Sequence, residues 1–278
     1  MRNITKQRIE DFHLYLINEE KSGATIEKYI RDIQAFSDWL DGRAFDKVDV
    51  LTYKAELTKK YAPASVNTVL SSLNSFFTYH EWYELKIKTL KIQRQIFASD
   101  EKELTKAEYE RLLLTAKKKS ERLYLLMQTI CSTGIRISEV SYVTVEAVNK
   151  GRADINCKGK RRTVFFPKQL CQMLKQYIRA QEIKNGAVFI TKNGAPLDRS
   201  NIWTSMKKLC IEANVSEQKV FPHNLRHLFA RTYYTQQKDI VRLADILGHS
   251  SVNTTRIYTM ESGETHRKQI QRLGLLLC

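Results

Sequence analysis

Arginine, lysine, histidine and tyrosine side chains gather in four short segments of this 278-residue chain, each where a helix or a turn is predicted to begin or end. In the first segment Gly134 ends a predicted helix, Arg136 follows, and Glu139 lies about one turn further on. Such a junction can direct a guanidinium into a cleft while a nearby carboxylate fixes its orientation. The second segment is the turn Lys158-Gly159-Lys160, which places a lysine at the tip of a predicted hairpin. Both segments could present cations to an anionic ligand.

The third and fourth segments add imidazole and phenol groups. His223 and Arg226 lie three residues apart, and therefore on one face of a predicted helix. His249 precedes Tyr258 by nine residues. Taken singly, each segment also has an ordinary structural explanation, such as an arginine paired with its neighbouring carboxylate, a solvated lysine, a capping histidine or a packed tyrosine.

A zinc site is the competing interpretation of the third segment, because His223 and His227 are four residues apart on the same predicted helix. The segment lacks the glutamate of the His-Glu-x-x-His pattern, and no acidic residue or cysteine close by supplies a third ligand. The five cysteines are an odd number and form no Cys-x-x-Cys pair, which argues against a disulfide framework and the common zinc motifs. We therefore expect no metal here.

The chain is basic, with 46 lysines and arginines against 30 acidic residues. Residues 1–95 hold 15 basic and 13 acidic side chains, so nearly all of the net charge of +16 falls on residues 96–278. A charge excess concentrated in one part of a chain favours polyanion binding, because neutralising phosphates releases counterions. A well-solvated surface is the alternative explanation. No apolar run is long enough for a membrane span, and the amino terminus lacks a secretory signal, so we expect a soluble protein of a reducing cytosol.

The elements that must position these segments are predicted to be mainly helical. In residues 1–95, apolar periodicity indicates four or five helices with short connections. Thr5 is predicted to cap the first, the second covers residues 24–40, a shorter third runs through Val50, Leu51 and Leu57, and Pro63 opens a fourth. These stripes predict a small helical bundle without chemistry of its own.

The periodicity breaks around residues 91–102, and we assign 96–102 as a linker between two domains. Residues 103–278 then read as a mixed, mostly helical domain with a small antiparallel sheet. Its predicted elements are a helix from the capping box Thr105–Glu108, a helix from Ser120 to Gly134, strands at Ala153–Cys157, Arg162–Phe166 and Val188–Thr191, and helices opened by Asp198, Pro222 and Asp239.

Taken together, the motifs TGIRISE, CKGKRRTVFFP, PHNLRHLFA and LGHSSVNTTRIYT resemble those of the tyrosine recombinase (phage integrase) family, particularly its compact Xer-type members. Their order and the nine-residue spacing from histidine to tyrosine follow the family pattern. The resemblance covers nearly the whole chain and includes SGATIEKYIRDIQAFSDWL at residues 22–40, which looks like the family's helical core-binding (SAM-like) domain. It implies that residues 1–95 form that DNA-binding domain and that 103–278 form the catalytic domain.

The resemblance also implies a reaction. Tyr258 would attack a DNA phosphate and form a 3′-phosphotyrosine, which conserves the bond energy so that rejoining needs no ATP. Arg136 and Arg226 would clamp the nonbridging oxygens, because a planar guanidinium matches phosphate geometry. Lys158 would protonate the departing 5′-oxygen. Lys160, in the same turn, is the alternative acid; Lys158 is favoured because it stands before the glycine of the family's GKG-like turn, where Cys157 replaces the commoner first glycine.

The remaining implied roles are supporting ones. His223 and His249 would complete the donors to the phosphate, and one of them would assist removal of the phenol proton. Glu139 would orient Arg136. No metal and no cofactor are implied, since cationic side chains would supply the stabilisation that metals give elsewhere.

The implied partner is a double-stranded DNA recombination site, bound by a homotetramer or by a heterotetramer with a second recombinase, with an accessory DNA-bending or directionality protein as a further partner. The apolar tail, residues 262–278, would be an exchange helix donated to a neighbouring protomer, or alternatively a helix packed on its own domain. The implied setting is the bacterial cytoplasm and nucleoid, in Xer-like chromosome partition or in mobile-element integration and excision. A type IB topoisomerase-like relaxase and a non-catalytic DNA-binding protein of the same fold remain as alternatives.

Overall fold

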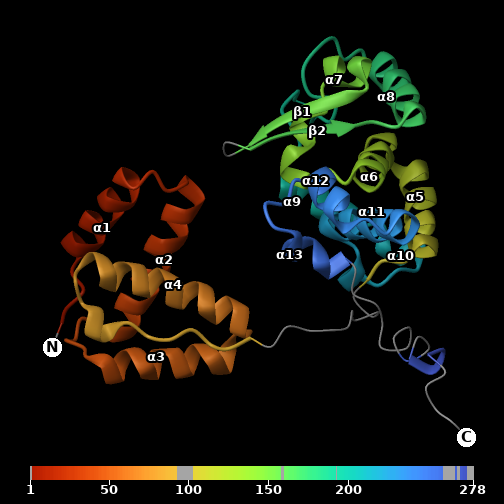
Figure 1. The fold of residues 1–278 in the computed structure, drawn as a ribbon. Coiled ribbons are helices and arrows are strands. Elements are labelled where there is room, and N and C mark those ends of the chain that lie inside the picture. The colour runs from red at the N-terminus through yellow and green to blue at the C-terminus, as the bar shows by residue number, and fades with distance from the viewer. Residues whose placement is uncertain are drawn as a thin grey trace, which may run out of the picture. The chain divides into compact units, whose positions relative to one another are not determined.

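The computed structural model describes residues 2–92, 103–157, 160–191, 193–258, 267 and 270–273, without the side chains of Cys157 and Lys160. The chain divides into two compact units, residues 1–94 and 95–278 (Figure 1). Each unit has buried hydrophobic clusters of its own. None of the described helices is both long and apolar enough to cross a membrane.

Within residues 2–92 the chain forms a bundle around an aromatic core. The elements are α1 (Lys6–Asn18), α2 (Gly23–Leu40), α3 (Lys47–Lys60), α4 (Pro63–Tyr79) and the short 3₁₀ helix η1 (Tyr83–Leu85). The predicted cap is confirmed, since the Thr5 side chain accepts a hydrogen bond from the backbone N–H of Arg8 at 3.3 Å. Pro63 opens α4 as expected. Among the fully buried side chains are Phe12, Ile33, Phe36, Leu70, Leu73, Phe76 and Phe77.

The third helix differs from its prediction. α3 has 14 residues, and its buried side chains include Val50, Tyr53 and Leu57. Leu51, which was expected on the apolar stripe, is exposed. The prediction was wrong there because residues one position apart in a helix point about 100° away from each other, so Leu51 cannot share the face of Val50.

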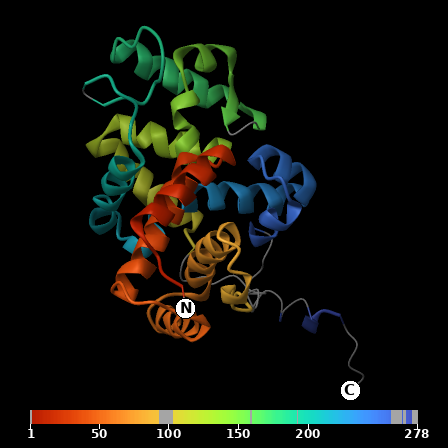
Figure 2. The same cartoon turned by 90° about the vertical axis from the view of Figure 1, so that its left-hand side faces the viewer.

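The second unit is a larger, mostly helical assembly with a single hairpin among its described residues. Figures 1 and 2 both place β1 and β2 together with α7 and α8 at the top of this unit, with α11, α12 and α13 below them. The elements are α5 (Lys106–Lys119), α6 (Glu121–Thr133), η3 (Ile137–Tyr142), α7 (Val145–Lys150), β1 (Arg152–Cys157), β2 (Lys160–Phe165), α8 (Lys168–Ala180), α9 (Arg199–Lys207), α10 (Cys210–Ala213), η4 (Glu217–Lys219), α11 (Pro222–Gln237), α12 (Ile240–Leu247), α13 (Val252–Thr255) and η5 (Arg256–Tyr258).

The helix boundaries predicted for this unit are confirmed where a cap or a breaker defined them. Thr105 and Glu108 form a reciprocal capping box at the start of α5. Ser120 caps α6, and Asp198 and Asp239 cap α9 and α12 in the same way. In each case a short polar side chain accepts a hydrogen bond from a backbone N–H of the first turn.

The hairpin is confirmed with shifted bounds, and the third strand is wrong. β1 and β2 pair antiparallel, with Cys157 opposite Lys160. At Val188–Thr191 the structure has only isolated bridges nearby, between Thr144 and Ala187 and between Ile190 and Pro196. Val188 and Phe189 are buried, but the backbone bonds of the segment go to two different neighbours, so no continuous ladder forms.

Candidate active site

The first predicted segment is built on the carboxyl end of α6. Gly134 ends this helix with φ of +65°, a left-handed conformation that favours glycine. A Cβ at this position would lie 2.5 Å from the Phe229 ring, so the close approach of α11 also requires glycine. Arg136 follows as the residue that caps η3. The end of α6 therefore fixes the position of the Arg136 backbone beside α11.

Glu139 holds Arg136 by two bonds. The Arg136 guanidinium donates to Oε1 of Glu139 at 2.9 Å, and the Arg136 backbone N–H donates to Oε2 at 2.9 Å. A second guanidinium nitrogen donates to the carbonyl of Gly248 at 3.1 Å. Glu139 is only 4 % exposed. Burial by itself raises the pKa of Glu139, but hydrogen bonds from Arg162 and Arg136 outweigh it and lower the pKa below its ordinary value, so the carboxylate stays charged.

Arg226, on α11, is 2 % exposed, and its guanidinium is held from several sides. It donates to the carbonyl of Gly134, to the carbonyl of Leu247 at 2.6 Å and to Nε2 of His249 at 3.2 Å. Burial lowers the pKa of Arg226 to about 10, helped by the charge of Arg136, so the group is still a cation at pH 7. Arg226 thus joins the ends of α6 and α12.

The hydrogen bonds of His249 define its tautomer. A guanidinium can only donate, so Nε2 of His249 must accept from Arg226. Nδ1 then carries the proton and donates to the Thr255 hydroxyl at 2.9 Å. Burial, together with the charges of Arg226 and Arg136, lowers the pKa of His249 to about 4. The imidazole is therefore neutral at pH 7.

His223 stands at the start of α11 and packs against His227, with the ring centroids 4.5 Å apart. The pKa of His223 is lowered, first by desolvation and then by the charges of Arg226, Arg136 and Arg199. The pKa of His227 falls to about 4, again mainly through burial. Both rings are neutral at pH 7 and can accept a proton or a hydrogen bond.

Tyr258 ends η5 and is 3 % exposed. Its ring lies between two imidazoles: that of His227, edge-on with centroids 4.7 Å apart, and that of His249, stacked with centroids 6.0 Å apart. Leu243 and Leu247 of α12 belong to the same buried cluster. The phenol therefore lies beside the predicted cations but is covered in this structure.

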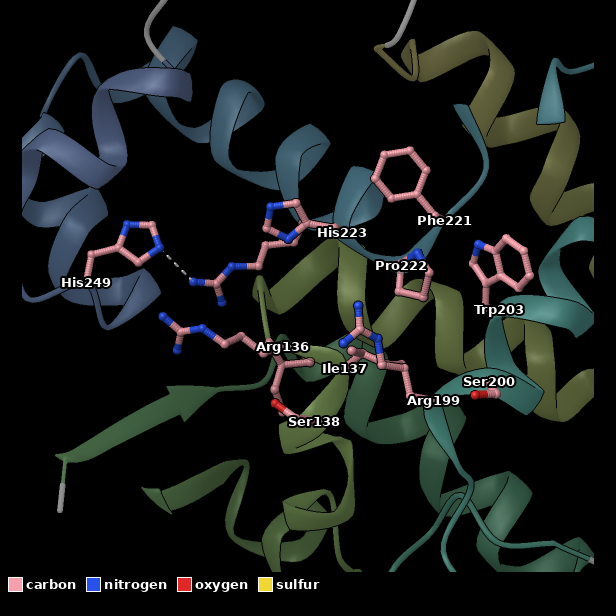
Figure 3. Close-up of a pocket in the computed structure, with 12 residues that line it drawn as sticks. Arg136, Ile137, Ser138, Arg199, Ser200, Trp203, Phe221, Pro222, His223 and His249 are labelled. Carbon is pink, nitrogen blue, oxygen red and sulfur yellow. Dashed lines mark hydrogen bonds between the residues drawn. The ribbon is translucent and has the colours of Figure 1, made fainter. Parts of the chain in front are cut away.

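A cavity of about 820 Å³ opens over these groups. Figure 3 shows Arg136, His223 and His249 on one side of the cavity, while Arg199 comes from α9 on the opposite wall. The lining residues are Ile135, Arg136, Ile137, Ser138, Arg199, Ser200, Trp203, Phe221, Pro222, His223, Arg226 and His249. With three guanidinium groups on its wall, this cavity can bind an oxyanion such as a phosphate.

The structure brings six of the seven residues selected from the sequence into one region: Arg136, Glu139, His223, Arg226, His249 and Tyr258. Lys158 lies outside the described residues. Within the part of the chain that is described, no group of three histidine, cysteine, aspartate or glutamate side chains is placed to hold a metal ion.

Sequence reasoning missed three side chains of this region: Arg162, which contacts Glu139; His227, which contacts Tyr258; and Arg199 on the cavity wall. For Arg162 a signal was present. Residues two apart in a strand share a face, and Arg162 shares its face with the buried Val164. A basic side chain on the buried face of a strand needs a carboxylate partner.

Comparisons with known proteins match both units of the chain. The phage integrase family matches residues 102–264, and the phage integrase N-terminal SAM-like domain matches residues 9–84. Tyrosine recombinase XerA of Pyrococcus furiosus is 28% identical over 99% of this chain and 96% of its own length.

Two solved structures share the fold. One is XerH site-specific recombinase bound to difH substrate in a pre-cleavage complex (TM-score 0.71, 21% identity, covering 96% of this chain and 85% of the other). The second is a lambda integrase dimer bound to a COC′ core site (TM-score 0.77, 15% identity, covering 94% of this chain and 97% of the other).

Proposed function

The chain belongs to the phage integrase family, and from that premise we propose that it is an Xer-like, site-specific tyrosine recombinase that cuts and rejoins DNA strands through a 3′-phosphotyrosine. The observation that carries the proposal is the convergence of Arg136, Arg226, His223 and His249 beside Tyr258. These groups come from separate parts of the chain and have the chemistry that phosphoryl transfer requires.

In the proposed reaction the guanidinium groups of Arg136 and Arg226 bind the two nonbridging oxygens of the DNA phosphate. The Tyr258 oxygen forms a bond to phosphorus while the bond from phosphorus to the 5′-oxygen breaks. His223 or His249 takes the phenol proton, a role for which a neutral imidazole is suited. For His249 this requires Arg226 to release Nε2, because Nδ1 already carries a proton. Because Tyr258 is buried here, its covering side chains must rearrange before the attack.

Lys158 is our proposed general acid, which gives a proton to the departing 5′-oxygen. The described pairing of Cys157 with Lys160 makes Lys160 the first residue of β2, and this position within a paired strand supports Lys158 over Lys160 as the acid.

The donor set supports a reaction without metal or ATP. The charges of Arg136 and Arg226 stabilise the transition state, and the phosphotyrosine stores the energy for rejoining. The substrate we propose is a double-stranded recombination site; the solved structure of XerH site-specific recombinase is bound to difH substrate. We further propose a tetramer on two such sites, linked by exchange of the segment 262–278, of which only residues 267 and 270–273 are described.

The experiment that tests this function starts with the DNA that the protein captures covalently in vivo. That DNA is sequenced, and two copies of the recovered site are placed on one plasmid. Site-specific recombination predicts excision or inversion between the copies, and neither when one copy is scrambled. Relaxation of supercoils without exchange would instead identify a topoisomerase, and binding without any covalent complex would identify a non-catalytic DNA-binding protein.

Removing the residues after Gly263 tests the assembly. If the tail links protomers, the truncated chain should still cleave a single site but should lose strand exchange between two sites. Full-rate exchange by the truncated chain would contradict the donated-helix proposal.

A further inference from the structure

Arg162 is a buried cation that the reaction above leaves without a role. It lies in β2, and its side chain is 11 % exposed. The neighbours Arg161 and Thr163 are exposed, as the alternation of a strand predicts. A buried guanidinium destabilises the folded protein unless hydrogen bonds and ion pairs replace its lost hydration. The partners of Arg162 therefore indicate its role.

Those partners belong to two other segments of the catalytic pocket. One guanidinium nitrogen of Arg162 donates to Oε2 of Glu139 at 2.5 Å, and another donates to the carbonyl of Ile246 near the end of α12. The fit around the side chain is tight, because a Cβ on Gly248 would clash with the Arg162 Cδ. Gly248 is the residue just before His249. Arg162 therefore ties β2 both to η3 and to the loop that carries His249.

The contact with Glu139 also changes the charge of the pocket. Glu139 is shared by two guanidinium groups, since its Oε1 binds Arg136 and its Oε2 binds both Arg162 and the Arg136 backbone. Two cations and one carboxylate leave one net positive charge. Without Arg162, the negative charge of Glu139 would cancel the positive charge of Arg136. The Arg136–Glu139 pair would then attract a phosphate only weakly.

We propose that Arg162 is a positioning residue for DNA cleavage, which shares Glu139 with Arg136 so that Arg136 keeps its orientation and presents an uncancelled positive charge to the phosphate. This inference rests on the proposed function. It gives Arg162 no contact with DNA; its effect passes through Glu139.

Variants that change or keep the charge at positions 162 and 139 test the inference. Arg162→Gln removes the charge but keeps an amide donor for Glu139, Arg162→Lys keeps the charge, and the double variant Arg162→Gln with Glu139→Gln removes one charge of each sign. The assay is the single-turnover rate of covalent adduct formation on a nicked cognate duplex at saturating protein, where differences in DNA affinity cancel. Arg161→Gln is the matched control, because it changes an adjacent, exposed arginine.

We expect Arg162→Gln to slow adduct formation about tenfold to a hundredfold, as for other groups that orient a catalytic side chain. Arg162→Lys should recover part of that loss, and the double variant should cleave faster than Arg162→Gln alone, because it restores the net charge beside the phosphate. Arg161→Gln should stay within about twofold of the unaltered protein, as most surface changes do.

The inference is overturned if Arg162→Gln cleaves like Arg161→Gln. It is also overturned if Arg162→Lys and the double variant are as slow as Arg162→Gln, since a purely structural role does not follow charge. Melting temperatures of the four variants show which of them fold, and the comparison of Arg162→Lys with the double variant remains decisive if Arg162→Gln does not. A failure of the unaltered protein to form any adduct would instead contradict the proposed function.

Discussion

Arg136 and Arg226 face the same cavity but are held in different ways. Arg226 is buried, and its donors serve the carbonyls of Gly134 and Leu247, which end two helices. Arg136 is about one-third exposed and is held mainly by Glu139. Arg226 therefore contributes to the fold as well as to phosphate binding, whereas Arg136 is the more specialised of the two.

This difference predicts unequal costs of truncation. Arg226→Ala should lower the free energy of unfolding by about 2–4 kcal/mol, because it leaves buried carbonyls without donors. Arg136→Ala should cost about 1 kcal/mol or less, since its site is partly open to water. Chemical denaturation of both variants measures the difference. Equal losses would show that the burial of Arg226 does not contribute to stability as described.

The lowered pKa values of His227 and His249, each about 4, predict how stability depends on pH. Between the ordinary value of 6.5 and about 4, the unfolded chain binds protons that the folded protein does not. Stability therefore falls as the pH decreases from 7 to 5, on the order of 1 kcal/mol for each ring. Urea unfolding at the two pH values measures this loss.

The variant that tests the cause is His227→Phe, which keeps a ring against Tyr258 but cannot titrate. His227→Phe should flatten the pH dependence. Stability that rises on acidification, or an unchanged slope in His227→Phe, would contradict the assignment.

The motifs and the family resemblance selected six side chains that the structure brings into one region, but they missed Arg199 on the cavity wall. They could not predict that Tyr258 is covered, because its burial depends on rings from two separate segments, His227 of α11 and His249 of the loop after α12. Nor could they pair Arg162 with Glu139, since 23 residues separate the two and only the folded hairpin brings them together. Contacts of this kind are fixed by packing and not by local pattern.

At the scale of elements, the carboxyl end of α6 has the most restrictive geometry. Both Gly134 and Gly151 end helices with positive φ, at +65° and +73°. A Cβ on Gly134 would clash with Phe229, whereas one on Gly151 would meet nothing within 4 Å. Comparing substitutions at the two positions therefore separates the cost of left-handed backbone strain from the cost of side-chain crowding.

Gly134→Ala should therefore destabilise the protein by about 2–4 kcal/mol, the sum of left-handed strain and overpacking, and Gly151→Ala by about 1 kcal/mol from strain alone. Gly134→Ala should also slow adduct formation, because it displaces a carbonyl that holds Arg226. Denaturation and single-turnover cleavage check both statements. Similar losses of the free energy of unfolding in the two variants would mean that the Phe229 ring moves aside without destabilising the protein.

Elements with local signals were predictable, and those defined by distant partners were not. Thr105 with Glu108, Ser120 and Pro63 marked helix starts through hydrogen bonding and backbone preference within a few residues. The apolar run at Val188–Thr191 carried a strand-like composition, but whether it forms a ladder depends on neighbours elsewhere in the chain. Burial alone does not make a strand.

At the scale of the whole molecule, charge is divided unevenly between the two parts of the chain. Residues 1–95 carry nearly balanced charge, and residues 96–278 carry most of the excess of +16. Counterion release makes DNA affinity fall with salt in proportion to the number of phosphates neutralised. Residues 96–278 should therefore contribute most of the salt dependence.

This predicts that a fragment of residues 96–278 shows a steeper fall of log affinity with log salt concentration than a fragment of residues 1–95. Each fragment contains its own hydrophobic core, so both can be examined in isolation after their folding is checked by circular dichroism. Fluorescence anisotropy on one duplex at several salt concentrations gives the slopes. A steeper slope for residues 1–95 would contradict this distribution of phosphate contacts.

The most direct measurement concerns the oxygen that attacks DNA. The protein is incubated with a nicked cognate duplex, the denatured adduct is isolated and digested, and mass spectrometry locates the modified residue. We expect the DNA on Tyr258, no adduct with Tyr258→Phe despite unchanged DNA binding, and a normal adduct with Tyr233→Phe, a tyrosine of the same packed cluster. DNA attached to any other residue, or an adduct that persists in Tyr258→Phe, would contradict the account.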